Sequence, residues 1–338
     1  MHAAVCPEYG PPEVIRVEEC PVPDAAPGQV GVRVRAAAVN FPDVLLVSNQ
    51  YQLSVPPPFV PGSEFAGIVD EIGDETTGLA VGDRVTGTGM FGAFAERVVV
   101  DAASLAPIPD GVDAPSAAAF GVAHRTAYHT LRSTAQLKPG DELVVLGAGG
   151  GVGLAAVQLG VALGANVTAV ASSAEKLDVA ASYGASRLIN VRRAGAERLG
   201  DQSSAVELRA ELKRALPDGA DVVIDPVGGE LSEPALRSLR RGGQFVTVGY
   251  ASGVIPRIPL NLVLVKGIHV IGFQFQDVPV AEFERNETEL RELLVSGRVA
   301  PHVCATYPLS ETATALRRVA DGKAIGKVLI DLSGREEQ

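Results

Sequence analysis

The sequence Glu142-Leu143-Val144-Val145-Leu146-Gly147-Ala148-Gly149-Gly150-Gly151-Val152-Gly153 decides the fold of this chain. Its first five residues form an apolar run, which predicts a buried parallel strand, and the glycines that follow predict a turn. Residues 154–163 predict a helix of mostly small side chains that ends at Gly164. Residues 166–171 predict a second strand. Together these elements make a βαβ unit with its glycines at the first strand-to-helix turn.

Such a turn directs backbone N–H groups and the positive end of a helix at one point, which suits a pyrophosphate. The pattern departs from the common GxGxxG fingerprint, because the register that ends at Gly153 has Ala148 in its first position. The alternative is a flexible glycine-rich linker, but linkers are not bracketed by two apolar strands. The residues expected to contact a dinucleotide here are Gly149, Gly150, Gly151 and Val152.

The end of the second strand indicates which dinucleotide binds. Units selective for NAD usually place an acid there to hold the ribose 2′-hydroxyl. This chain has Ser172, Ser173 and Lys176 instead, and hydroxyls with a cation suit the 2′-phosphate of NADPH. Glu175 is the one acid in this stretch that argues against NADPH. Its position in the first turn of the following helix is explained by the helix dipole. The serines have an alternative role as a helix N-cap pair.

Composition excludes several classes of partner. The chain has 338 residues and a formal net charge of −11, which argues against nucleic acid or an anionic membrane. Residues 1–10 lack a basic segment followed by an apolar run, and no apolar run approaches a membrane span. The three cysteines are far apart, which predicts reduced thiols. We therefore expect a cytoplasmic protein that acts on a small molecule.

The order of the predicted elements indicates an α/β protein of two domains. Up to residue 111, short runs of Val, Ile and Ala alternate with Pro and Gly, which predicts a small β-rich domain. Its strands are expected at residues 14–17, 30–35, 67–72, 83–86 and 95–100. From residue 114, helices and strands alternate, which predicts a doubly wound sheet of six parallel strands. The strands of that sheet are expected at residues 142–146, 166–171, 188–190, 221–224, 244–248 and 269–273.

The last elements are too few for a third domain, so we expect them to return to the first. The predicted domains are residues 1–120 with 277–338, which form the β-rich domain, and residues 121–276, which form the nucleotide-binding domain.

Eight short blocks carry a resemblance to a known family. They are Ala38-Val39-Asn40-Phe41-Pro42-Asp43, Pro58-Phe59-Val60-Pro61-Gly62-Ser63-Glu64-Phe65-Ala66-Gly67, Val81-Gly82-Asp83-Arg84-Val85, Gly92-Ala93-Phe94-Ala95-Glu96, Arg125-Thr126-Ala127-Tyr128-His129, the glycine turn, Asp225-Pro226-Val227-Gly228-Gly229 and Gly326-Lys327-Val328. In these blocks the chain resembles the zinc-free quinone oxidoreductase (zeta-crystallin-like) branch of the medium-chain dehydrogenase/reductase superfamily. The resemblance implies a GroES-like catalytic domain, a Rossmann domain, and NADPH-dependent reduction of a quinone or another α,β-unsaturated carbonyl.

The resemblance also implies that no metal is bound. Zinc-dependent relatives carry a cysteine where this chain has Asn40 and a histidine where it has Ser63, and residues 86–94 replace their four-cysteine lobe. Catalytic zinc needs three protein ligands and structural zinc needs four. Glu64 cannot hold zinc alone, so we expect it to act as a structural hydrogen-bond acceptor.

Two residues are candidates for the catalytic step. Asn40 resembles the asparagine whose amide orients the nicotinamide ribose or the substrate oxygen, and its alternative role is that of a turn residue before Pro42. Tyr51 matches a tyrosine that quinone reductases place against the nicotinamide and that enoyl thioester reductases use as an acid. Its alternative role is that of a half-buried loop aromatic. A second tyrosine of some quinone reductases is Leu45 here.

The remaining cofactor contacts are implied by the resemblance alone. Thr126 is expected under the nicotinamide, although a helix hydroxyl can also bond back one turn. Arg192 is expected at the adenosine phosphate. Residues after the fifth and sixth strands are expected at the nicotinamide, mainly through backbone atoms, and these are Gly249, Tyr250, Phe273 and Gln274.

Two other functions stay open. The first is a 2-enoyl thioester reductase that uses NADPH, with Tyr51 as proton donor. The second is a nucleotide-binding protein without catalysis, as in crystallins of the family. A homodimer is also expected, because residues 270–273 form an apolar edge strand that a soluble protein pairs.

Overall fold

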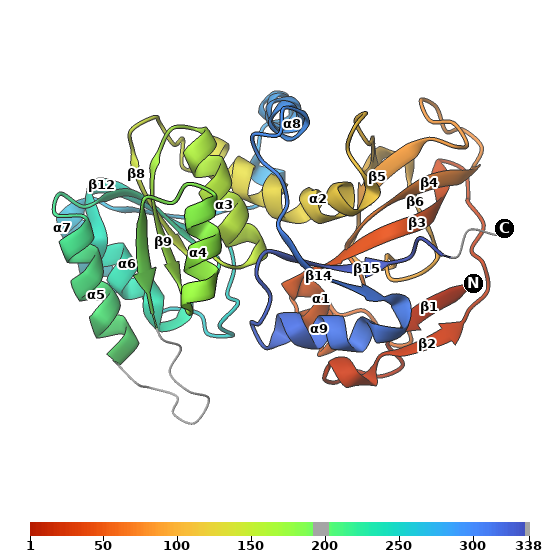
Figure 1. Cartoon of the computed structure of the whole chain (residues 1–338), viewed down its shortest axis with the longest axis horizontal. Helices are drawn as coiled ribbons and strands as arrows, with labels where there is room; N and C mark the ends of the chain where they lie inside the picture. Colours follow the sequence, from red (N-terminus) through yellow and green to blue (C-terminus); the bar gives the residue numbers. More distant parts are fainter. Residues whose placement is uncertain (192–202, 335–338) are drawn as a thin grey trace. The chain divides into compact units, whose positions relative to one another are not determined.

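The computed structural model of this chain describes residues 1–191 and 203–334 as two compact units (Figure 1). Unit 1 consists of Met1–Val122 with Ala300–Gln338, and unit 2 consists of Ala123–Val299. Unit 1 is rich in β-strands, and unit 2 is built on a parallel sheet with helices. The predicted fold class is therefore confirmed.

Unit 2 contains a six-stranded sheet in the order β10-β9-β8-β11-β12-β13, and all its neighbouring strands are parallel. The strands are β8 (Glu142–Leu146), β9 (Asn166–Ala171), β10 (Arg187–Asn190), β11 (Ala220–Asp225), β12 (Leu239–Thr247) and β13 (His269–Gly272). The central strands are unbroken apolar runs because helices cover both faces of the sheet. Leu143, Val144 and Leu146 are accordingly fully buried.

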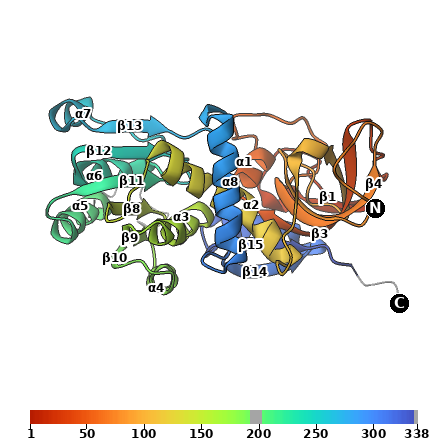
Figure 2. The same ribbon diagram turned by 90° about the horizontal axis from the view of Figure 1, so that it is seen from above.

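The helices of unit 2 beyond β8 alternate with its strands along the chain or follow them. They are α3 (Gly151–Ala162), α4 (Ala174–Ser182), α5 (Ser203–Ala215), α6 (Ser232–Ser238), α7 (Leu260–Lys266) and α8 (Val280–Val295). Helices α3 and α4 cover one face, and α5 and α6 cover the other (Figures 1 and 2). This is the doubly wound arrangement that the sequence predicts.

Two boundaries in unit 2 differ from the prediction. Helix α3 begins at Gly151 rather than at residue 154, so the last glycines of the turn form its first turn. Residues 277–299 group with unit 2 rather than with the β-rich domain. The reason is that α8 bonds to the end of helix α2 (Ala114–His129), where Glu287 accepts from His129 at 2.8 Å and Glu289 accepts from Tyr128 at 2.6 Å.

Unit 1 contains a seven-stranded sheet in which β14-β15-β3-β4-β5-β7 are neighbours and β6 also pairs with β3. The strands are β3 (Gln29–Val39), β4 (Glu64–Ile72), β5 (Arg84–Thr88), β6 (Arg97–Asp101), β7 (Leu105–Pro107), β14 (Val303–Pro308) and β15 (Lys327–Asp331). Strand β3 pairs with three others, because β6 and β15 bond to different ends of one edge. The two parts of the chain that make unit 1 are thus joined in one sheet.

The sequence missed several short elements of unit 1. These are β1 (His2–Val5), α1 (Phe41–Val47) and β7, and the strand expected at residues 14–17 is β2 (Arg16–Glu19) after a short 3₁₀ turn. Helix α1 was not predicted because Pro42 suggests a turn, although proline is well tolerated in the first turn of a helix. Helix α9 (Thr312–Ala320) packs against α1 and β15. No helix within the described residues is both long and apolar enough to cross a membrane.

Candidate functional site

The glycine turn of unit 2 is shaped by a close backbone approach. A β-carbon on Gly153 would lie 2.1 Å from the carbonyl oxygen of Gly147, so only glycine permits this contact. Gly147 has a φ of +61°, a conformation that glycine adopts without strain. Gly150 is the N-cap of α3, and the N–H groups of the first helical turn have no carbonyl one turn earlier. These N–H groups are available to an anion.

Lys176, in the first turn of α4, lies against the glycine turn. A β-carbon on Gly149 would lie 2.5 Å from Cγ of Lys176, so the lysine stem covers this glycine. Ser173 is the N-cap of α4, and its Oγ accepts the Lys176 N–H at 3.3 Å. Ser172 is exposed. The N-cap role is therefore confirmed for Ser173, and a contact of either serine with a phosphate stays a prediction.

The other predicted cofactor residues of unit 2 follow the carboxyl ends of its strands or lie in α2. Gly249 and the exposed Tyr250 follow β12, and the buried Phe273 and exposed Gln274 follow β13. Thr126 is half-buried in α2. Their contacts with a cofactor stay predictions. Arg192 lies outside the described residues.

Asp225, at the end of β11, is a further residue that supports the glycine turn. Its carboxylate is fully buried and accepts the N–H groups of Val227 and Gly228, each at 2.8 Å, and the hydroxyl of Ser232 at 2.5 Å. Burial raises the pKa of Asp225, and these hydrogen bonds oppose the change. The loop held in this way packs Val227 against Gly147, because a β-carbon on Gly147 would lie 2.6 Å from Cγ2 of Val227. An acid directly before a proline at a strand end was the available signal.

In unit 1, Asn40 belongs to a buried cluster of polar side chains. It is the N-cap of α1 and is 8% exposed. Its Nδ2 donates to Ser63 Oγ at 3.1 Å and to Glu64 Oε1 at 3.0 Å, and its Oδ1 accepts from Lys327 Nζ at 2.5 Å. An ammonium has only donors, so the atom of Asn40 that faces Lys327 must be the oxygen.

This arrangement decides what Asn40 can offer to a ligand. Both hydrogens of Nδ2 are directed at protein acceptors, and one lone pair of Oδ1 is used by Lys327. The Asn40 side chain also faces the Asp43 N–H in the capping box of α1. Because both hydrogens of Nδ2 are used, any contact of Asn40 with a ligand is made by Oδ1 as an acceptor, which suits a hydroxyl rather than a carbonyl oxygen. Of the two ligand groups that the resemblance implies, the ribose hydroxyl fits this geometry better than the substrate oxygen.

Glu64 is the acceptor at the centre of the cluster. Its Oε1 accepts from Asn40 and Lys327, and its Oε2 accepts the N–H of Val122 at 2.7 Å. It is 1% exposed and therefore needs these partners. Its predicted role as a structural hydrogen-bond acceptor is confirmed.

Asp43 is a second buried acid of this cluster, and its residue type and position alone did not indicate a role. Its Oδ2 accepts the N–H of Asn40 at 2.7 Å, while Oδ1 has no hydrogen-bond partner among the described residues. Burial raises its pKa to about 7, against the opposing effects of Asn40, Ser63 and the charge of Lys327. A carboxyl with this pKa exchanges its proton near neutral pH.

Tyr51 lies beyond the other end of α1 from Asn40. Its ring is half-buried against the core of unit 1, which fits its alternative role as a loop aromatic. No described residue hydrogen-bonds to its hydroxyl. The hydroxyl can therefore bond to a ligand without first losing a protein partner.

Within residues 1–191 and 203–334, no three His, Cys, Asp or Glu side chains gather where they could hold a metal ion.

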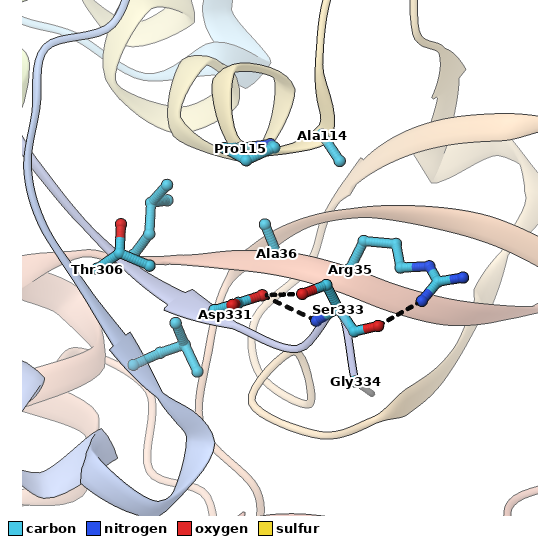
Figure 3. A pocket seen from close by; sticks show the side chains of 10 residues that line it. Arg35, Ala36, Ala114, Pro115, Thr306, Asp331, Ser333 and Gly334 are labelled. Atoms are coloured by element: carbon cyan, nitrogen blue, oxygen red, sulfur yellow. Dashed lines mark hydrogen bonds between the residues drawn. The ribbon is translucent and has the colours of Figure 1, made fainter. Parts of the chain in front are cut away.

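Unit 1 also has a cavity of about 670 Å³, in which Pro115 at the start of α2 faces strands β3 and β15 (Figure 3). The described residues that line it include none of those predicted for the site. This cavity is therefore separate from the Asn40 cluster.

Comparisons with known proteins agree with these features. Residues 26–110 match the alcohol dehydrogenase GroES-like domain, and residues 151–293 match the zinc-binding dehydrogenase family. Quinone oxidoreductase-like protein 2 of Bos taurus is 36% identical over 98% of this chain and 92% of the relative. The structure of Escherichia coli quinone oxidoreductase complexed with NADPH has a TM-score of 0.87 and 29% identity over 98% of this chain and 100% of that one. A mycobacterial protein complexed with NADPH has a TM-score of 0.88 and 28% identity over 98% and 99%.

The raised pKa of Asp43 predicts a pH-dependent stability. Because its pKa rises from 3.8 to about 7 on folding, the folded chain binds this proton more tightly than the unfolded chain. The free energy of unfolding should then fall as the pH rises from about 4 to about 7. In Asp43→Asn this loss should be absent, so the variant should gain up to about 4 kcal/mol relative to wild type across that range.

Urea unfolding of both proteins between pH 4 and 8 measures the effect. Asp24→Asn, at an exposed position of the same unit, is the control and should follow wild type. If the free energies of unfolding of Asp43→Asn and wild type changed in parallel with pH, Asp43 would not titrate in this way.

Proposed function

Since this chain belongs to the medium-chain dehydrogenase/reductase superfamily, we propose that it reduces a quinone or another α,β-unsaturated carbonyl with NADPH. The observation that carries the proposal is the glycine turn, where Gly153 allows α3 to approach β8 and Lys176 covers Gly149. The first turn of α3 offers N–H groups without a helical partner to a pyrophosphate, and the neighbouring strand β9 ends without an acid. The E. coli and mycobacterial proteins of similar structure are NADPH complexes.

Each group of residues has a proposed part in this reaction. The bound cofactor supplies the hydride. The turn residues Gly149 to Val152 hold the pyrophosphate, and Ser172, Ser173 and Lys176 bind the 2′-phosphate. Asn40 accepts a hydroxyl of the ligand, since its amide hydrogens are directed at protein acceptors. A quinone needs no protein acid, because its oxygens can take protons from water after hydride transfer.

Zinc independence is part of the proposal. Asn40 and Ser63, which stand where zinc-dependent relatives have ligands, bond to each other at 3.1 Å. Glu64 bonds to Lys327, so its charge is already compensated. A cytoplasmic location is also proposed, from the acidic composition and the sparse cysteines.

A second candidate function is supported by Tyr51. Its hydroxyl has no partner among the described residues and can therefore donate a proton to the α carbon of an enoyl thioester. Turnover of NADPH with a panel of quinones and enoyl thioesters distinguishes both reductases from a non-catalytic nucleotide-binding protein.

A homodimer is proposed from the edge of the unit 2 sheet. Strand β13 is the last strand and pairs only with β12 among the described strands. Helix α7, which precedes it, exposes Leu260, Leu264 and Val265 by 65% or more of their surface. Apolar side chains gathered at an open sheet edge are typical of an interface with a second copy.

The cofactor proposal predicts a preference that depends on Lys176. NADPH should bind at least roughly tenfold more tightly than NADH, because charge-assisted hydrogen bonds hold its 2′-phosphate. Lys176→Ala should remove most of this difference, and Lys138→Ala, an exposed lysine of the same unit, should preserve it. Titration of nicotinamide fluorescence measures both constants. Equal wild-type affinity for the two cofactors would contradict the proposal.

Replacement of Tyr51 by Phe separates the two reductase functions. The variant keeps the ring but lacks the hydroxyl, so quinone reduction should stay near the wild-type rate. Turnover of an enoyl thioester should fall roughly a hundredfold if Tyr51 donates the proton. Both substrates are assayed side by side with deuterated NADPH to follow hydride transfer. A wild type that ignores quinones, reduces enoyl thioesters and loses that activity in Tyr51→Phe would favour the second function.

The dimer proposal predicts the effect of a charge on α7. Leu264→Asp should shift the protein to monomers at micromolar concentration, because the charge would be buried between copies. Val206→Asp on α5 adds the same charge at an exposed apolar position away from β13 and should leave the dimer intact. Sedimentation velocity measures the masses. A wild type that sediments only as a monomer would refute the proposal.

A further inference from the structure

Lys327, the first residue of β15, is buried in the Asn40 cluster. It is 3% exposed and forms an ion pair with Glu64, which is 1% exposed. Lysine is almost never buried to this extent without a specific partner. The preceding turn permits no alternative residue at Gly326, because a β-carbon there would lie 2.2 Å from the carbonyl oxygen of His302. Lys327 therefore enters the cluster from a sterically defined backbone position.

The ammonium of Lys327 has an acceptor for each of its three hydrogens. It faces Glu64 Oε1, Asn40 Oδ1 at 2.5 Å and the carbonyl oxygen of Val39 at 3.4 Å. Glu64 Oε1 also accepts from Asn40 Nδ2, so the three side chains form a closed triangle. An amide rotation that brought Nδ2 toward Lys327 would set donor against donor. Lys327 thus holds the Asn40 amide in one orientation.

Stability alone does not account for this ion pair. Removing two charges from water costs about as much as their attraction returns, and apolar residues of similar volume often replace such pairs without loss. An ion pair in this position is better explained by the geometry that it imposes on its neighbours. The neighbour with a proposed ligand contact is Asn40.

We propose that Lys327 is a positioning residue for the reaction, which acts by holding the Asn40 amide in the orientation that gives a ligand its oxygen rather than its nitrogen. This inference rests on the proposed function. It predicts that loss of Lys327 impairs turnover through Asn40 rather than through folding.

The main test is a variant without both charges, Lys327→Met with Glu64→Gln, called the neutral pair. Gln at residue 64 can still accept the Val122 N–H, so the fold should be kept. We expect kcat for the preferred substrate to fall roughly tenfold to a hundredfold, since small displacements of a positioning group have effects of this size. The affinity for NADPH, measured by fluorescence, should change much less. Lys266→Met is the matched control, because Lys266 bonds only to backbone carbonyls of Arg237 and Leu239 in the described part of unit 2.

A double-mutant cycle identifies the route of the effect. In an Asn40→Ala background, the neutral pair should cause no further loss of kcat, because the residue through which Lys327 acts is gone. Additive losses, or a neutral pair with wild-type kcat, would overturn the proposal. If the neutral pair does not fold, Lys327→Arg serves instead. It keeps the charge, but its planar guanidinium cannot reproduce the three single bonds, so kcat should fall in a folded protein. A wild-type kcat in that variant would equally overturn the proposal.

A structural readout is independent of activity. Crystal structures of the wild type and the neutral pair should differ at Asn40, whose contact with Ser63 should be lost in the variant. An unchanged Asn40 side chain would overturn the role of Lys327 whatever the substrate. Failure of the wild type to oxidise NADPH with any substrate would refute the proposed function. The comparison of the two crystal structures would then decide whether Lys327 orients the Asn40 amide.

Discussion

The nucleotide-binding unit depends on the contact between the first turn of α3 and the end of β8. A β-carbon on Gly153 would collide with the Gly147 carbonyl, so the helix can start this close to the strand only because residue 153 has no side chain. Side chains from the segments that follow β11 and β9 then cover the turn, with Val227 against Gly147 and the stem of Lys176, in α4, against Gly149. The first turn of α3, which starts this close to the strand, has N–H groups without a helical partner, and these can bind a phosphate, which links a steric constraint to the proposed binding.

In unit 1 the corresponding constraint is electrostatic. The cluster around Glu64 is buried, and a buried charge without a partner costs several kcal/mol, so each member depends on the others for its bonds. Lys327 compensates Glu64, and both hold Asn40. Asp43 is the incomplete member, with one oxygen unpartnered and a raised pKa. A cluster of this kind fixes the orientation of polar side chains inside a β-rich unit.

Local patterns explain what could be predicted. The βαβ unit was recognised because an apolar run, glycines and a second apolar run follow one another within thirty residues. Helix α1 was missed because Pro42 suggests a turn, and α8 was assigned to the wrong side of a boundary because its periodicity does not reveal its partners. Those partners are His129 and Tyr128, more than 150 residues earlier in the chain. For Asp225 the only sequence signal is an acid directly before a proline at a strand end, which does not reveal the three hydrogen bonds of its carboxylate.

The sequence by itself determined the α/β class, the six parallel strands, the position of the glycine turn and the absence of an acid at the end of β9. These features follow from residue type and short-range spacing, which act within a turn or a strand. Only the tertiary structure decided which atoms of Asn40 remain for a ligand and which cation compensates Glu64. Lys327 is 287 residues from Asn40 and 263 from Glu64, and β15 brings it there by pairing with β3. No pattern of neighbouring residues encodes such a contact, because hydrogen-bond geometry between distant side chains exists only once the sheet has formed.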